Sequence, residues 1–313
     1  MTPWLLCLLG LVILLLAGDS LVKGAVNLSL RLGVPAMIVS LTIVAFGTSA
    51  PELLISIKAV LDNAPGIALG NVVGSNTANI LLVLGIPALI ATMHTSAFDS
   101  RSSFVQMIAA TFLFIALAFT GVFGGWTSIV LLGALAGMLG HAIWQAKKHR
   151  KACEDDVELD GADPELPYWR IWVFLVLGLI GLPIGANVLV ENAEVIARQY
   201  GVPETVIGLT LIAVGTSLPE LATTVMAALR KQADVALGNV IGSNMFNLLA
   251  IVGIASLLGP IQVDPAFLRL DLWVMLVASL LLIPFVFLQQ DITRVWGGVL
   301  FGLYVIYMIV IFV

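Results

Sequence analysis

The chain has 313 residues, of which 60% are hydrophobic and only 11% are charged, and its formal net charge is −5. An ordinary soluble domain carries about 25% charged residues, and a soluble fold of this length could not cover its surface with so few. Eleven of the charged residues lie between Lys147 and Glu165, so the rest of the chain is more depleted still. These numbers exclude a soluble domain, a disordered chain, collagen and a coiled coil, and predict an all-α polytopic membrane protein.

Apolar segments of membrane-spanning length recur along the whole chain. In order they are 3–22, 34–60, 66–92, 103–122, 127–146, 168–190, 203–229, 234–258, 270–288 and 293–313. We therefore expect ten transmembrane helices in two groups of five, 1–146 and 168–313, joined by a hydrophilic linker at 147–167. The first segment has no basic residues before it, so we interpret it as a retained helix rather than a signal peptide.

The basic residues predict how the chain is oriented, since Lys and Arg are enriched in cytoplasmic loops. With the linker 147–167 in the cytoplasm, eleven basic residues fall on that side and three (Lys58, Arg198 and Arg269) fall outside. We therefore expect a multi-pass protein of the plasma (inner) membrane, with both termini outside.

Several classes of function lack support in the sequence. Cys7 and Cys153 form neither a disulfide framework nor a metal-ligand spacing. No basic patch with interleaved aromatic residues is present, so we expect no binding of nucleic acid. The spans also lack the motifs of an intramembrane protease. We expect neither an enzyme nor a resident cofactor, and no protein partner is evident.

The chain contains an internal repeat. Residues 33–86 align without a gap with 201–254, at an offset of 168, and 26 of the 54 positions are identical. Two long motifs recur: GTSAPE (47–52) as GTSLPE (215–220), and ALGNVVGSN (68–76) as ALGNVIGSN (236–244). Because five helices per half is an odd number, the second half should be inverted relative to the first. Inverted repeats with interrupted helices in matching positions, here helices 2, 3, 7 and 8, are typical of secondary transporters with a site near the midplane.

Glu52 and Glu220 are the central candidates for that site. Each lies in the middle of an apolar span with no Lys or Arg nearby in the sequence, and an unpaired buried carboxylate binds a proton or a cation. Pro51 and Pro219 lack an N–H and should interrupt their helices, exposing backbone carbonyls. Gly74 supplies a further expected interruption, as does Gly242 in the second half.

The repeated polar groups around the glutamates are all oxygen ligands. Thr48, Ser49 and Glu52 can share one helix face, and Ser75 lies four residues before Asn79. The second half repeats this set with Thr216, Ser217, Glu220, Ser243 and Asn247. Hard cations such as Ca²⁺ and Na⁺ suit carboxylate, hydroxyl, amide and carbonyl oxygens, whereas zinc and copper prefer nitrogen or sulfur.

The motifs GTSAPE and GTSLPE, each followed by ALGNVxGSNxxN, resemble the two α-repeats of the sodium/calcium exchangers, within the cation/Ca²⁺ exchanger superfamily. The chain is most similar to the compact prokaryotic type. The resemblance implies an antiporter that binds Ca²⁺ and Na⁺ in turn at one site. It also implies the ligands: Glu52 and Glu220 for Ca²⁺, helped by the carbonyls of Thr48 and Thr216; Ser49, Ser75, Ser217 and Ser243 with the carbonyls of Ala45 and Ala213 for Na⁺; and Asn79 and Asn247 at the centre.

One departure from the family pattern leaves the counter-ion open. Several family members carry Asp at one of the positions of Asn79 and Asn247, whereas here both are Asn. The predicted site therefore has two carboxylates rather than three. Na⁺/Ca²⁺ exchange is the favoured interpretation, Ca²⁺/H⁺ antiport is the alternative, and a cation channel is a more distant one.

Overall fold

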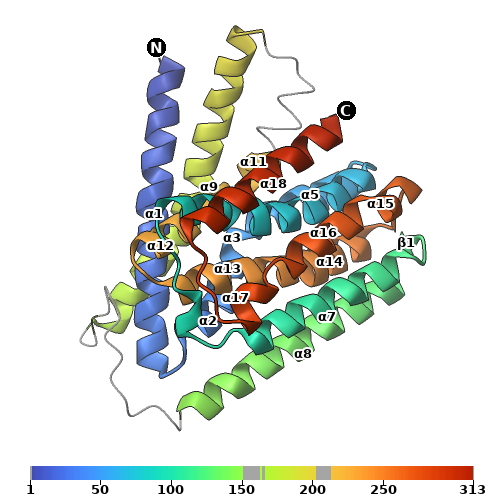
Figure 1. The fold of residues 1–313 in the computed structure, drawn as a ribbon. Coiled ribbons are helices and arrows are strands. Elements are labelled where there is room, and N and C mark those ends of the chain that lie inside the picture. Colours follow the sequence, from blue (N-terminus) through green and yellow to red (C-terminus); the bar gives the residue numbers. More distant parts are fainter. Residues whose placement is uncertain (1, 151–162, 164–165, 202–212, 313) are drawn as a thin grey trace.

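The computed structural model describes residues 2–150, 163, 166–201 and 213–312, and this part of the chain is almost entirely helical (Figure 1). In the first half the helices are α1 (Thr2–Leu32), α2 (Ala36–Val39), α3 (Ala45–Thr48), α4 (Ala50–Leu61), α5 (Pro65–Ala78), α6 (Gly85–Ile90), α7 (Arg101–Ala118) and α8 (Gly125–Arg150). In the second half they are α9 (Tyr168–Gln199), α11 (Ala213–Thr216), α12 (Leu218–Leu229), α13 (Ala233–Phe246), α14 (Val252–Leu258), α15 (Pro265–Arg269), α16 (Asp271–Leu280), α17 (Ile283–Phe287) and α18 (Arg294–Phe312). Among the described residues, three π-helical segments, η1 (Ser40–Val44), η2 (Asn79–Val83) and η5 (Asn247–Ile251), and one 3₁₀ segment, η3 (Thr95–Ala97), lie between these helices.

Two long helices, α1 and α9, lie side by side at one edge of the molecule (Figure 1). Small residues allow their backbones to approach closely. A Cβ atom added at Gly185 would lie 2.9 Å from the Leu14 nitrogen and 3.0 Å from the Gly10 carbonyl oxygen. A Cβ atom at Gly178 would likewise lie 2.8 Å from the Leu21 Cα. Glycine at these positions is therefore what lets the two helices pack as a pair.

Seven of the described helices are long and apolar enough to span a membrane, and the bent pair 36–48 and 50–61 makes eight. Two shorter apolar helices, Leu218–Leu229 and Arg294–Val310, account for two more of the predicted spans. The beginning of the predicted span 203–229 lies outside the described residues, so the count of ten remains a prediction.

Two predicted helices are too short. The first ends at Leu32 rather than at residue 22, and the sixth ends at Gln199 rather than at residue 190. In both cases the helix continues through charged residues that pair along it: Lys23 Nζ lies 3.0 Å from an Asp19 oxygen, and Arg198 Nη2 lies 3.3 Å from a Glu194 oxygen. Pairs four residues apart on one helix stabilise it, so an end placed by hydropathy alone falls too early.

The remaining helices enclose the larger hydrophobic core. It includes Val72, Met107, Phe114, Val240 and Leu249, all fully or almost fully buried. A two-residue antiparallel pairing of β1 (Val122–Phe123) with β2 (Ile261–Gln262) joins the loop after α7 to the loop after α14. This core surrounds the central helices α4, α5, α12 and α13, which carry the repeated motifs.

Candidate cation site

Each motif helix is interrupted just before its glutamate. The chain leaves helical geometry at Ser49 (φ −84°, ψ 6°) and at Ser217 (φ −86°, ψ 3°), and α4 and α12 begin directly afterwards. In the first half the two helical pieces are bent by 43°. Pro51 has no N–H to donate to the Gly47 carbonyl, which explains a break at this point. The predicted interruption at the two Pro-Glu motifs is therefore confirmed.

The second predicted interruption lies elsewhere. Gly74 and Gly242 are inside the continuous helices α5 and α13, and the helical pattern changes only at Asn79 and Asn247, where η2 and η5 begin. Placing breaks at these two glycines was wrong. Gly242 has a packing reason instead, because an added Cβ would lie 2.6 Å from the Ala45 Cβ and would also strike the Leu41 carbonyl oxygen.

The two glutamates lie in the first turns of α4 and α12, and each is 1% exposed. Ser49 and Glu52 have the Ser-x-x-Glu spacing of a capping box. However, Ser49 makes no capping hydrogen bond to its own helix, and its hydroxyl donates to Glu220 Oε1 in the other half, at 3.1 Å. Ser49, which the sequence pattern would place as the cap of its own helix, thus links the two halves of the chain instead.

Thr48 lies next to this link and also reaches the second half. Its hydroxyl lies 3.3 Å from Asn239 Oδ1, 3.4 Å from Ser243 Oγ and 3.4 Å from the Ala45 carbonyl oxygen. The Asn239 amide in turn donates to Thr224 Oγ1 at 3.3 Å. These contacts bring motif residues of α3 and α13 together with Thr224 of α12.

The asparagines of the second motif join the two halves directly. Asn76 Nδ2 donates to the Asn244 carbonyl at 3.1 Å, and Asn244 Nδ2 donates to the Asn76 carbonyl at 3.3 Å. Asn79 Nδ2 donates to Asn244 Oδ1 at 3.0 Å. Asn76, Asn79 and Asn244 therefore form hydrogen bonds between the two halves of the chain. The sequence did not decide between a ligand role and a packing role for Asn76 and Asn244, and the reciprocal bonds show that both connect the repeats.

The side chain of Asn71 forms a hydrogen bond with the backbone carbonyl of Glu52. Its Nδ2 donates to the Glu52 carbonyl at 3.2 Å and to Ser56 Oγ at 3.1 Å. The contact between Asn239 and Thr224 is the counterpart of the contact between Asn71 and Ser56 at an offset of 168 residues. Sequence comparison missed Ser56 and Thr224 because they are not identical, although both carry a hydroxyl.

The other predicted ligands are placed as follows. Ser75 and Ser243 are buried on α5 and α13, and Thr216 and Ser217 are buried at the end of α11 and just after it. The Ala45 carbonyl accepts the Ser49 N–H at 3.1 Å, whereas the Ser217 N–H bonds to Val214 rather than to Ala213. The two halves therefore differ in this turn.

Several buried oxygen atoms of this region have no hydrogen-bond partner within the described part of the chain. They are Glu52 Oε2, Glu220 Oε2, Asn76 Oδ1, Asn79 Oδ1, Asn247 Oδ1 and Ser217 Oγ. An unsatisfied buried polar group costs about 1–3 kcal/mol, and more if it is charged. No ion pair to either glutamate is found among the described residues. Two carboxylates with neutral oxygens around them fit a hard cation as cargo, and no His or Cys belongs to this group of atoms in the described part of the chain.

Comparison with known proteins agrees with this chemistry. The family model for the sodium/calcium exchanger protein matches residues 2–144 and 170–313. The chain belongs to the sodium/calcium exchanger family. Members of this family are membrane antiporters and not enzymes.

Individual relatives cover nearly the whole exchanger. Sodium/calcium exchanger MaX1 from Methanosarcina acetivorans is 35% identical over 99% of this chain and 98% of its own. Putative antiporter CaxA from Alkalimonas amylolytica is 38% identical over 88% of this chain and 87% of its own. Among solved structures, the sodium-calcium exchanger NCX_Mj soaked with Na⁺ and Sr²⁺ matches with a TM-score of 0.82 and 30% identity, over 97% of both chains.

Proposed function

We propose that this exchanger moves Ca²⁺ out of the cell against an inward flow of Na⁺, by alternating access at one shared site near the membrane midplane. The observation that carries the proposal is the pair of buried glutamates, Glu52 and Glu220. The Oε2 atom of each has no hydrogen-bond partner within the described part of the chain. Ca²⁺ and Na⁺ would compete for these oxygens, so that the site holds one kind of ion at a time.

The ligands in this proposal are those predicted by sequence. Glu52 and Glu220 bind Ca²⁺ with the help of Thr48 and Thr216. Na⁺ uses Ser49, Ser75, Ser217, Ser243 and the carbonyls of Ala45 and Ala213, and Asn79 and Asn247 complete the centre. The link from Ser49 to Glu220 supports a site built from both halves, because it joins two of these residues across the repeat.

The proposed architecture has ten transmembrane helices as two inverted repeats, 1–146 and 168–313, with a cytoplasmic linker at 147–167 and both termini outside. The equal bounds of α4 and α12, of α5 and α13, and of η2 and η5 after a shift of 168 residues support the repeat. The excess of basic residues on one side supports the orientation. An impermeant thiol reagent tests it: a single cysteine in the linker of a cysteine-free variant should react only after the inner face is exposed.

Proteoliposomes test the ion coupling. An outward-directed Na⁺ gradient should drive uptake of ⁴⁵Ca²⁺, and Glu52→Gln or Glu220→Gln should abolish it because each removes one of two charges. Glu191→Gln serves as the matched control, since Glu191 is an exposed glutamate on α9. Full transport by either of the first two variants would overturn the site assignment.

Ca²⁺/H⁺ antiport is the second candidate, and a specific observation favours it. Both Asn79 and Asn247 are amides, so the site has two carboxylates, and two protons neutralise them as well as one Ca²⁺ does. Uptake driven by a pH gradient without Na⁺ would support this candidate. Calcium flux that needs no counter-ion gradient at all would instead indicate a channel.

A further inference from the structure

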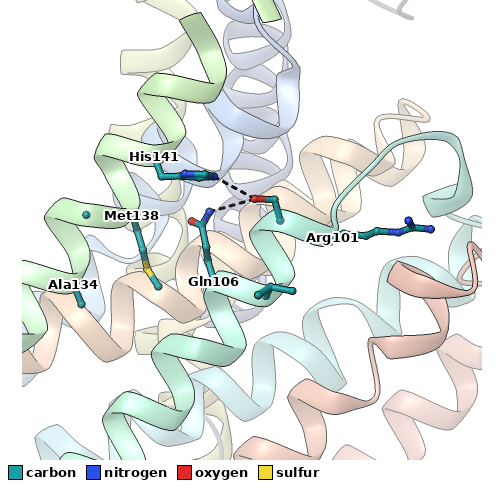
Figure 2. Close-up of a pocket in the computed structure, with 8 residues that line it drawn as sticks. Arg101, Gln106, Ala134, Met138 and His141 are labelled. Atoms are coloured by element: carbon teal, nitrogen blue, oxygen red, sulfur yellow. Dashed lines mark hydrogen bonds between the residues drawn. The ribbon is translucent and has the colours of Figure 1, made fainter. Parts of the chain in front are cut away.

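A groove of about 600 Å³ lies between α7 and α8 (Figure 2), and none of the residues that line it belongs to the candidate cation site. One wall comes from the first turns of α7, with Arg101, Ser102, Val105 and Gln106. The other comes from α8, with Ala134, Gly137, Met138 and His141. Val105 and Gly137 are exposed, so the groove opens on the outer surface of the helix bundle, where lipid surrounds a membrane protein.

At one end of the groove, polar side chains of its lining meet Gln145, which lies beside them on α8. Three side chains converge on the hydroxyl of Ser102: Gln145 Nε2 at 2.9 Å, Gln106 Nε2 at 3.4 Å and His141 Nε2 at 3.4 Å. A single hydroxyl oxygen cannot satisfy both amide groups and an imidazole. The remaining N–H groups suit a ligand that carries several acceptor oxygens, as a phosphate does.

The lower part of the groove is apolar and open. Val105, Ala134 and Met138 line it, and Gly137 provides its depth, because an added Cβ there would meet no atom within 4 Å. Donors above an apolar slot make an amphiphilic site, which fits a headgroup joined to a hydrocarbon chain.

The surroundings place this site at the level of lipid headgroups. Trp144 is 57% exposed, and its ring lies 5.6 Å from that of His141. Exposed Trp residues are enriched at the membrane–water interface. Lys147 lies about one helical turn after Trp144 on α8 and is exposed. The Arg101 side chain lies at the edge of the groove and extends away from His141 (Figure 2). Asp99 also lies nearby, and one oxygen of its carboxylate accepts the backbone N–H of Arg101 at 3.0 Å. Arg101 and Lys147 carry two positive charges against the one negative charge of Asp99, so these three side chains leave a net charge of +1 that favours an anion.

We propose that this groove binds one anionic phospholipid, with its phosphate among Ser102, Gln106, His141 and Gln145 and one acyl chain between α7 and α8. The site goes beyond ion exchange and depends on membrane insertion, not on the cation ligands. It is a specific lipid site, distinct from the general coat of lipid around the bundle.

Native mass spectrometry of the full chain in a neutral detergent tests the proposal, with dioleoyl phosphatidylglycerol and dioleoyl phosphatidylcholine as probes. The first phosphatidylglycerol should bind about tenfold more tightly than phosphatidylcholine, which corresponds to about 1.4 kcal/mol at 25 °C. Gly137→Leu, whose Cβ would meet no atom within 4 Å, places a side chain in the slot and should remove the tight site. Gly140→Leu, at an exposed glycine of the same helix that does not line the groove, is the matched control and should keep it.

Two further arms separate the sources of the ligand and the role of charge. The double variant Arg101→Gln, Lys147→Gln should bring the affinity for phosphatidylglycerol close to that for phosphatidylcholine. Glycerol 3-phosphate and inorganic phosphate should fail to displace the bound lipid, because they lack the acyl chain. Equal affinities of wild type for the two lipids would refute the proposal, as would an unchanged tight site in Gly137→Leu or displacement by free phosphate.

Discussion

Gly242 lies where α13 of the second half packs directly against the first half, and Gly242→Ala should disturb the candidate site without changing any of the proposed ligands. The added Cβ would lie 2.6 Å from the Ala45 Cβ and 2.8 Å from the Leu41 Cα. Carbon atoms are in favourable contact at about 3.5–4.0 Å, so α13 must move away by roughly 1 Å. Backbone atoms make up most of the obstacle, and they cannot turn aside as a flexible side chain can.

That displacement acts on stability and transport to different degrees. Overpacking costs about 1–3 kcal/mol, whereas Ala in place of Gly within a helix returns roughly 1 kcal/mol, so the net loss of stability should be about 0–2 kcal/mol. Transport should suffer more, because Ser243 follows Gly242 directly and already lies 3.4 Å from Thr48. A misplacement of about 1 Å at a site can cost around a hundredfold in rate.

Two assays on the same preparation separate the effects: thermal unfolding in detergent, and ⁴⁵Ca²⁺ uptake into proteoliposomes. Gly133→Ala on α8 is the control, since an added Cβ there meets nothing within 4 Å. The control should keep transport and gain slightly in stability. Wild-type transport together with wild-type stability in Gly242→Ala would refute the packing argument.

Three further predictions concern other parts of the fold. Arg230→Gln should destabilise the protein by about 1 kcal/mol in chemical unfolding, because Arg230 Nε lies 2.5 Å from Asp19 Oδ1 and joins α12 to α1; additive effects of this change and Asp19→Asn would contradict such coupling. Gly185→Ala should lower the melting temperature through an overpacking cost of about 1–3 kcal/mol, since it forces α1 and α9 apart, and an unchanged melting temperature would count against their close packing. Burial raises the pKa of Asp291, but hydrogen bonds from Ser96 and His94 outweigh it and hold the pKa below its ordinary value. The Asp291 carboxylate thus stabilises the fold above the ordinary Asp pKa, and this stability is lost as the pH falls through the lowered pKa; Asp291→Asn should remove that part of the acid dependence in pH-resolved unfolding.

Much of the candidate site could be proposed from the sequence because the same residues occur twice. Polar groups in apolar spans are costly, so a pair of glutamates repeated at an offset of 168 residues stood out without any structure. The break before each glutamate followed from the missing N–H of Pro51 and Pro219. These are local effects of residue type, and the chain order alone carries them.

Contacts between the two halves of the chain could not be predicted from the sequence. Nothing in the order of residues shows that Ser49 bonds to Glu220 instead of capping its own helix, or that Asn76 and Asn244 exchange bonds. The role of Gly242 was misjudged for a related reason. A glycine within a helix either weakens it or admits a neighbouring backbone, and only the position of Leu41 distinguishes the two.

The two buried glutamates also determine how membrane voltage would act on the exchanger. With a charge of −2 and no ion pair among the described residues, the site becomes neutral when it holds one Ca²⁺ or two monovalent ions. A third monovalent ion leaves one positive charge uncompensated. Moving that charge through the field is worth about 2.3 kcal/mol per 100 mV. Membrane voltage should then drive the step in which the site crosses the membrane with three monovalent ions, and it should leave the step that carries Ca²⁺ unaffected. The charge moved per transport cycle therefore reports how many counter-ions the site carries.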